Sequence, residues 1–312
     1  RLREQELDGV VAEVIYPDAG EGHKVPFGGG LQQDQEGESD PVLLLAGARA
    51  YNRWLADLCA QAPERRAGIA VLTLHDIDAA VQEVRWARAH GLRGGVMIPA
   101  GVGALPFYNH PRYEALWRIC SELDMPINCH SGSGAPDYGS HPGASAIWIS
   151  EIVWYARRPL TFLIWSGVFE RHPRLKFVLS EQNADWAPYT IQSLDRIYER
   201  PMFAQVRKDL PSRPSEYWQR CCFIGASMLS RLECSMRAEI GVGNLMWGSD
   251  YPHAEGTWPH SRAALRETFA GVPPTEVSAM LGGNAARVYG FELAKLEPLA
   301  RRVGPSTAEL AA

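Results

Sequence analysis

The stretch Leu245-Met246-Trp247-Gly248-Ser249-Asp250-Tyr251-Pro252-His253 decides how the rest of the chain is interpreted. Apolar residues run up to Gly248, and a carboxylate and an imidazole follow within a few positions. This pattern is typical of a buried strand with an acid at its carboxyl end, which in a parallel α/β barrel faces the active site. An Asp there can bind a metal ion or transfer a proton. Taken alone, Asp250 is better explained as a residue that caps a turn before Pro252. Its interpretation as a metal ligand or proton carrier therefore depends on the other segments.

Composition sets the class of protein. The chain has 312 residues, 46% of them hydrophobic and 21% charged, which suits one large α/β domain or two small ones. A formal net charge of -5 argues against nucleic acid or an anionic membrane as the main partner. The chain has no apolar run of the length that a transmembrane helix needs. Its six cysteines lack a C-x-x-C spacing, and scattered thiols predict the reducing cytoplasm.

Short apolar segments that alternate with helical sequence predict the fold. We interpret seven such segments as strands: residues 11–17, 68–72, 95–99, 126–130, 175–181, 221–225 and 244–250. Alternating strand and helix predicts a parallel sheet, and the spacing is that of a TIM (β/α)8 barrel. Since that barrel needs eight strands, we expect the first strand to be missing from this chain and to lie upstream of Arg1. A doubly wound open sheet is the alternative, disfavoured because no G-x-G-x-x-G follows the first segment.

The remaining organisation is simple. We expect residues 1–295 to form one barrel domain and residues 296–312 to form a C-terminal tail. Residues 20–40 lack a period and are predicted to be a loop. Helical spacing predicts a helix over 46–60, and two apolar helices over 145–157 and 160–171. The apolar helices over 147–169 offer a face on which a homodimer could form, although the barrel shell could equally cover them.

Three polar residues follow different predicted strands. His130 ends one strand and precedes a Ser-Gly-rich loop, Glu181 ends another, and Asp250 ends the last. Carboxyl ends of parallel strands meet at one rim, so these side chains should converge. An imidazole with carboxylates is a typical ligand set for a divalent metal, with zinc expected and manganese as the alternative. For Glu181, three roles stay open: metal ligand, partner of a ligand histidine, or salt-bridge acid.

Weaker candidates lie in neighbouring loops. His253 could act in catalysis by hydrogen-bonding substrate or by holding Asp250, or it could be a surface loop residue. Tyr108 and His110 follow the strand at 95–99 and are candidates for substrate contact. Trp258 could line the mouth of the site, or it could pack the loop.

Several motifs in this order resemble one family. They are Asn128-Cys129-His130-Ser131-Gly132, the segment 177–181 followed by Trp186-Ala187-Pro188-Tyr189, and Trp247-Gly248-Ser249-Asp250-Tyr251-Pro252-His253. Together with 283–290 they resemble the amidohydrolase-related family, in the branch of aminocarboxymuconate-semialdehyde and resorcylate decarboxylases. The resemblance covers residues 1–291 and implies a metal-dependent TIM barrel. It implies that His130 is a metal ligand and that Asp250 is a ligand and proton carrier.

Two features depart from the family pattern. Nothing before Val11 matches the H-x-H motif of the family's first strand, and Glu181 stands where the best-studied decarboxylases have a histidine. Our first hypothesis is a metal-dependent decarboxylase of an aromatic or unsaturated carboxylic acid. The alternative is a metal-dependent hydrolase on the same scaffold, in which Asp250 would activate a metal-bound water. A third hypothesis is a metal-free binding or structural subunit.

Overall fold

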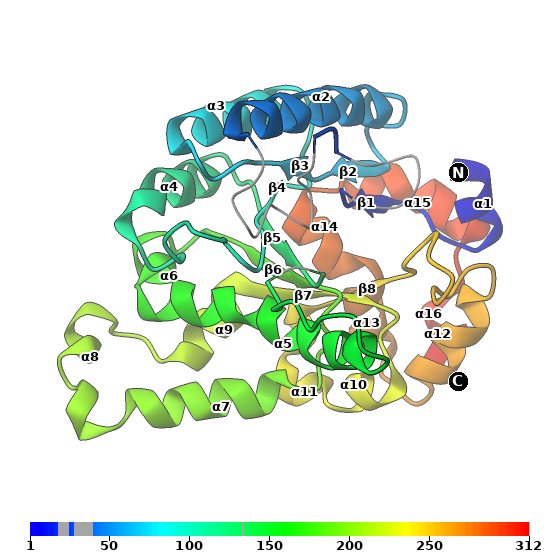
Figure 1. The fold of residues 1–312 in the computed structure, drawn as a ribbon. Coiled ribbons are helices and arrows are strands. Elements are labelled where there is room, and N and C mark those ends of the chain that lie inside the picture. The colour runs from blue at the N-terminus through cyan, green and yellow to red at the C-terminus, as the bar shows by residue number, and fades with distance from the viewer. Residues whose placement is uncertain (18–24, 28–39, 133, 312) are drawn as a thin grey trace.

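Parallel strands form the centre of the molecule, and helices cover them (Figure 1). The computed structural model describes residues 1–17, 25–27, 40–132 and 134–311, so most of the loop predicted at 20–40 lies outside the described residues. The strands are β1 (Glu13–Ile15), β2 (Arg66–Gly68), β3 (Ala70–Val71), β4 (Val96–Met97), β5 (Ile127–His130), β6 (Phe177–Ser180), β7 (Cys222–Ser227) and β8 (Leu245–Gly248).

The strands follow chain order around the sheet, as in a TIM barrel. β1 pairs with β2, and β3 to β8 form a six-stranded parallel sheet in sequential order. Only Ile69 separates β2 from β3: its N–H donates to the Ile15 carbonyl at 3.0 Å, while the N–H of Ala70 donates to Gly95 at 2.9 Å. β2 and β3 are therefore one strand position that changes partner. The seven predicted segments and their parallel arrangement are confirmed.

The α/β barrel stays open at one place. In the part of the chain that the structure describes, no ladder of hydrogen bonds joins β1 to β8. Residues of both strands instead line a cavity of about 1080 Å³. The opening matters for function because this cavity runs to the rim where the carboxyl ends of the strands meet.

Helices surround the strands, and two depart from the predicted bounds. α2 begins at Pro41 rather than at 46, because Asp40 accepts a hydrogen bond from the N–H of Val42 at 2.8 Å and caps the helix. The two helices predicted over 145–157 and 160–171 are wrong, since one helix runs through Pro159 to Trp165. The α-helices are α1 (Leu2–Leu7), α2 (Pro41–Ala60), α3 (Ile77–Ala89), α4 (Glu114–Glu122), α5 (Ala144–Trp165), α6 (Val168–Arg171), α7 (Ala187–Tyr198), α8 (Val206–Asp209), α9 (Pro214–Cys221), α10 (Arg231–Ser235), α11 (Arg237–Ile240), α12 (Ser261–Phe269), α13 (Pro274–Ser278), α14 (Asn284–Tyr289), α15 (Leu293–Val303) and α16 (Thr307–Ala311).

Shorter turns and the C-terminal helices complete the fold. Three 3-10 turns cover Pro111–Tyr113, Pro201–Phe203 and Val242–Asn244, and a π-helical turn covers Ala279–Gly283. α16 brings Leu310 into contact with the body, where it is buried. The division between 295 and 296 stays a prediction. No helix in the described ranges is long and apolar enough to cross a membrane.

The buried side-chain amide of Asn52 joins helix α2 to strand β3 and helix α3. Asn52 on α2 is fully buried, and its side chain accepts from the N–H of Val71 at 2.8 Å and donates to the Val71 carbonyl at 2.9 Å. It also donates to Glu83 on α3 at 2.9 Å. Asn52 therefore supplies hydrogen-bond partners for the backbone N–H and carbonyl groups of Val71 in β3. A neighbouring strand would otherwise have to supply them.

We expect Asn52→Ala to destabilise the protein by about 2–4 kcal/mol, because it leaves buried backbone groups and a buried carboxylate without this partner. Urea denaturation followed by circular dichroism measures the free energy of unfolding. Asn109→Ala is the control, since Asn109 is an exposed loop residue and its loss should change stability by less than about 0.5 kcal/mol. Equal midpoints for the two variants would contradict the role given to Asn52.

Candidate active site

Strand register brings the sequence-predicted acids and imidazole to one rim. His130 is the last residue of β5 and lies beside Ser180, the last residue of β6, so Glu181 follows directly next to it. Asp250 follows the end of β8. His130, Glu181 and Asp250 all line the cavity between β1 and β8. The predicted common rim is therefore present: Glu181 and Asp250 belong to one cluster of potential metal ligands, and His130 lies outside that cluster, 2.7 Å from Glu181.

His130 and Glu181 form a partly buried polar contact at this rim. The Nε2 atom of His130 lies 2.7 Å from the Oε2 atom of Glu181, and its Nδ1 atom lies 2.7 Å from the Ser131 carbonyl oxygen. Since a carbonyl oxygen only accepts, Nδ1 carries a proton. The Nε2 lone pair and the carboxylate then repel each other unless a proton or a cation lies between them. The contact is thus suited to a positive charge.

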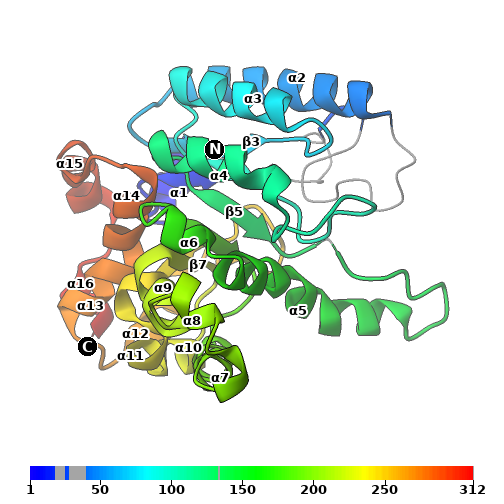
Figure 2. The same cartoon turned by 90° about the vertical axis from the view of Figure 1, so that its left-hand side faces the viewer.

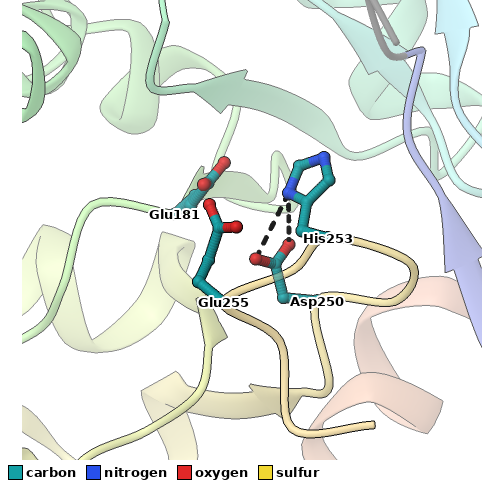
Figure 3. A group of neighbouring side chains, drawn as sticks. All are labelled: Glu181, Asp250, His253 and Glu255. Atoms are coloured by element: carbon teal, nitrogen blue, oxygen red, sulfur yellow. Dashed lines mark hydrogen bonds and ion pairs between the residues drawn. The ribbon is translucent and has the colours of Figure 1, made fainter. Parts of the chain in front are cut away.

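A four-residue cluster continues from Glu181 (Figure 3). Potential ligand atoms of Glu181, Asp250, His253 and Glu255 all lie within 4.8 Å of one another. The Nδ1 atom of His253 is 3.2 Å from one oxygen of Asp250 and 3.3 Å from the other. Figure 3 shows the three carboxylates and the imidazole directed toward a common centre. Three acids and an imidazole form a donor set that fits a zinc or manganese ion.

The electrostatics of Asp250 follow from this crowding. Burial raises the pKa of the Asp250 carboxyl, and the negative charge of Glu181 raises it further. His253 opposes both effects through its charge and its hydrogen bond. Asp250 therefore holds a proton more tightly than an exposed aspartate does, unless a cation takes the place of that proton.

The backbone is strained at the same positions. Glu181 has a φ of 53° and Asp250 a φ of 58°, both in the left-handed region that non-glycine residues avoid. Such strain costs on the order of 1–3 kcal/mol per residue and is concentrated at functional sites. Gly256 lets the following loop fold back closely, because a Cβ atom there would lie 2.8 Å from the Ser249 carbonyl oxygen. The loop thereby returns Glu255 to Asp250.

Sequence reasoning missed two residues of the site. Glu255 lies in the loop after β8, and the only signal for it was its closeness in sequence to Asp250. Tyr16 follows β1 and lines the cavity, with its ring centroid 5.3 Å from that of His130. Its hydroxyl lies 2.6 Å from the Ser180 hydroxyl, and burial raises the pKa of Tyr16. A tyrosine at the end of a predicted strand, next to Pro17, was the available signal.

The structure does not bring the other candidates to the cluster. Tyr108 is buried against Tyr113 and Trp117, and its hydroxyl donates to the Pro99 carbonyl at 2.6 Å. Tyr108 and His110 line a separate, smaller cavity of about 390 Å³. Trp258 is partly exposed and packs edge-on against Tyr251 in the loop after β8. Of the three, only Trp258 lies near the rim, through Tyr251.

Similarity to known proteins agrees with this geometry. The chain is 29% identical over 221 residues to the gamma-resorcylate decarboxylase of Rhizobium radiobacter, which covers 66% of this chain and 65% of that protein. The chain thus spans less than two thirds of that relative. The crystal structure of 2,6-dihydroxybenzoate decarboxylase from Rhizobium superposes with a TM-score of 0.70 at 21% identity, covering 93% of this chain and 87% of the other. A 5-carboxyvanillate decarboxylase of Novosphingobium aromaticivorans, complexed with manganese, has a TM-score of 0.70 at 17% identity, covering 93% and 79%.

The family itself is shown by a broader match. The amidohydrolase family model matches residues 27–291, which include every strand from β2 to β8 and all four members of the acidic cluster. The strand order, the rim position of the acids and this match give the same answer: the chain belongs to the amidohydrolase family.

Proposed function

We propose that this protein is a metal-dependent decarboxylase that acts on a hydroxylated aromatic carboxylic acid. The observation that carries the proposal is the convergence of Glu181, Asp250, His253 and Glu255 at the strand ends, within 4.8 Å, in an amidohydrolase barrel. The relatives named as gamma-resorcylate and 5-carboxyvanillate decarboxylases support the reaction and the substrate class. The adjoining cavity of about 1080 Å³ has room for a substituted benzene ring.

The metal would be held by Glu181 and Asp250, with His253 and Glu255 from the same cluster, and His130, 2.7 Å from Glu181, would join as a further ligand. These donors suit zinc, and the manganese of a structural relative makes manganese the second candidate. When bound there, the ion would supply Lewis-acid chemistry that stabilises the negative charge developing during the reaction.

Asp250 supplies the proton in the proposed reaction. As the bond between the ring carbon and the carboxylate breaks, its electron pair stays on the carbon and takes the proton of the Asp250 carboxyl, while carbon dioxide leaves. Asp250 follows the end of β8 and lines the cavity, so its carboxyl group faces the space that a bound substrate would fill. The His253 imidazole, 3.2 Å from Asp250, orients the carboxyl group and is the route for its reprotonation.

Other properties complete the proposal. The partner is a small carboxylic acid rather than nucleic acid, in keeping with the net charge of -5. A cytoplasmic location is supported by the six cysteines, which are all buried free thiols. We also propose a homodimer, and substrate contact by Trp258 at the rim. For Tyr108 and His110, their separate cavity offers no support as substrate contacts.

Metal content tests the site directly. After loading with zinc or manganese and desalting, we expect about one ion per chain by mass spectrometry, and a loss of most of it in Asp250→Ala and Glu181→Ala. Glu122→Gln is the control, because this acid is exposed on α4, outside the cluster. Failure to bind either ion, or full retention in both alanine variants, would contradict the proposed centre.

Analysis of the products tests the proposed reaction. The metal-loaded protein, with 2,6-dihydroxybenzoate or 5-carboxyvanillate, should release carbon dioxide and the decarboxylated phenol, measured by isotope release and chromatography. Hydrolysis of ester or amide derivatives, with no carbon dioxide from the acids, would favour the hydrolase alternative. If the protein binds the metal tightly but catalyses neither reaction, the proposed metal site is correct and the proposed substrate class is wrong.

A further inference from the structure

Most of the acidic cluster depends on one segment of the chain, the loop between β8 and α12, which we call the β8 loop (residues 249–260). Three of the four members of the cluster lie in it: Asp250, His253 and Glu255. The N–H of Thr257 donates to the Ser249 carbonyl at 2.9 Å and so closes the loop on itself. The position of this loop relative to the barrel therefore decides whether the three side chains meet Glu181.

Two features oppose the closed β8 loop in the metal-free protein. Asp250 has a left-handed φ of 58°, a conformation that is unfavourable for any residue other than glycine. The carboxylates of Asp250, Glu255 and Glu181 also crowd together, with potential ligand atoms within 4.8 Å, and their like charges repel. An attachment outside the cluster is therefore needed to offset these two effects.

That attachment comes from the N-terminal part of the chain. Asp8, directly after α1, is 6% exposed, and Ser261, the first residue of α12, is fully buried. Asp8 accepts from the N–H of Ser261 at 3.0 Å, and its other oxygen accepts from the Ser261 hydroxyl. The Thr257 hydroxyl lies 2.6 Å from that of Ser261. Two views place α1 and α12 on the same side of the molecule as α16 (Figure 1, Figure 2).

The carboxylate of Asp8 sets the direction of these hydrogen bonds. Because a carboxylate only accepts, the Ser261 hydroxyl donates its single hydrogen to Asp8. The Ser261 oxygen can then only accept from the Thr257 hydroxyl. That hydroxyl also lies 3.5 Å from the Ser249 carbonyl oxygen, but the contact of 2.6 Å is the one that takes its hydrogen. The hydrogen bonds therefore run in one direction, from the β8 loop to a buried carboxylate.

Asp8 also caps α12 and is itself held by the body. The N-cap residue His260 makes no capping hydrogen bond with its side chain, and Asp8 takes the N–H of Ser261 instead. At the other side, Glu6 on α1 pairs with Arg65 at 2.7 Å. One row of buried and partly buried polar groups thus joins the β8 loop to α12 and α1.

We propose that Asp8, Ser261 and Thr257 are positioning residues that hold the β8 loop closed, so that its three ligands meet as a preformed set before a metal ion binds. This inference rests on the metal centre of the proposed function. None of the three residues belongs to the cluster, so each acts on the metal only through the loop. Opening of the loop lowers the apparent metal affinity in proportion to the fraction of protein that stays closed.

Thr257→Val tests the attachment, because it keeps the shape of the side chain and the backbone N–H and removes only the hydroxyl. In the metal-free protein, hydrogen exchange measured by mass spectrometry should become roughly threefold to tenfold faster in the β8 loop, the effect of one lost hydrogen bond. Thr257→Ser keeps the hydroxyl and should exchange like the unaltered protein. The matched control is Thr268→Val, because Thr268 is a partly buried residue of α12 whose hydroxyl donates to the Leu229 carbonyl at 2.9 Å, away from the loop. Unchanged exchange of the loop in Thr257→Val would overturn the proposal.

Zinc affinity, measured by competition with a chromophoric chelator, tests the consequence for the metal. Thr257→Val should bind zinc roughly threefold to tenfold more weakly, while Thr257→Ser and Thr268→Val should bind it like the unaltered protein. Asp8→Ala should also weaken binding, and adding Thr257→Val to it should cause little further loss, because the row acts as one unit. Unchanged affinity in Thr257→Val, or an equal loss in Thr268→Val, would show that the row does not position the ligands. If the unaltered protein binds no zinc, the proposed metal centre fails, and the exchange of the loop alone then supports or overturns its attachment.

Discussion

Asp250→Asn is expected to lower turnover of the aromatic acid by at least about 100-fold, because it removes the proton donor and weakens the metal site. The fold should remain intact, since the amide has nearly the shape of the carboxyl group. The same substitution should raise the melting temperature of the metal-free protein at neutral pH. Activity and stability are therefore expected to change in opposite directions.

The sign of the stability change follows from the raised pKa of Asp250. Burial and Glu181 make the folded chain bind this proton more tightly than the unfolded chain does. Its favourable contribution is complete below the unfolded pKa, and it is lost as pH rises through the raised folded value. At neutral pH, the Asp250 carboxylate thus destabilises the metal-free fold, and Asn removes that charge. A bound cation reverses the balance by neutralising the carboxylates.

Thermal unfolding by calorimetry, with chelator, should show the advantage of Asp250→Asn at pH 7 and a smaller advantage near pH 4. Asp57→Asn is the control, because Asp57 is exposed on α2 and should change neither activity nor this pH dependence. If Asp250→Asn retains turnover, the proton-donor role is wrong. If it destabilises the metal-free protein at pH 7, the claim that repulsion between the Glu181 and Asp250 carboxylates destabilises the metal-free fold is wrong.

The sequence predicted the strands well because buried parallel strands are short apolar runs, and each such run here is followed by a helix. It also predicted the convergence of His130, Glu181 and Asp250, because polar residues after such runs share one rim. Local pattern could not reveal that the loop after β8 folds back to place Glu255 in the cluster. Tyr108 shows the opposite limit: it follows the right strand, but aromatic packing with Tyr113 and Trp117 turns its side chain into the core.

Helix α5 shows a third limit. The two helices predicted over 145–157 and 160–171 are one helix in the structure as far as Trp165, and it runs through the buried Pro159. Whether an apolar helix face is covered depends on what lies beyond it in space, and periodicity does not contain that information. The structure supplies it by showing that Ala156, Leu160 and Leu163 form part of the face that meets the barrel.

Gly95→Ala is expected to destabilise the protein by more than about 4 kcal/mol or to prevent soluble expression. A Cβ atom at Gly95 would lie 1.9 Å from the carbonyl oxygen of Pro126, and this neighbour is backbone that a rotamer change cannot move. The same carbonyl accepts the N–H of Val96 at 2.8 Å at the start of the β4–β5 ladder. Relief of the clash would therefore separate two central strands of the barrel.

Gly91→Ala isolates this clash from backbone strain. Gly91 has a φ of +83° and Gly95 one of +88°, so both substitutions place a side chain in the same unfavourable conformation, which costs about 1–2 kcal/mol. A Cβ atom at Gly91 would meet nothing within 4 Å. The difference between the two free energies of unfolding, measured in urea, is thus the effect of close approach between β4 and β5. Equal losses would mean that the strands can part here, and that the barrel does not depend on this contact to hold His130 at the rim.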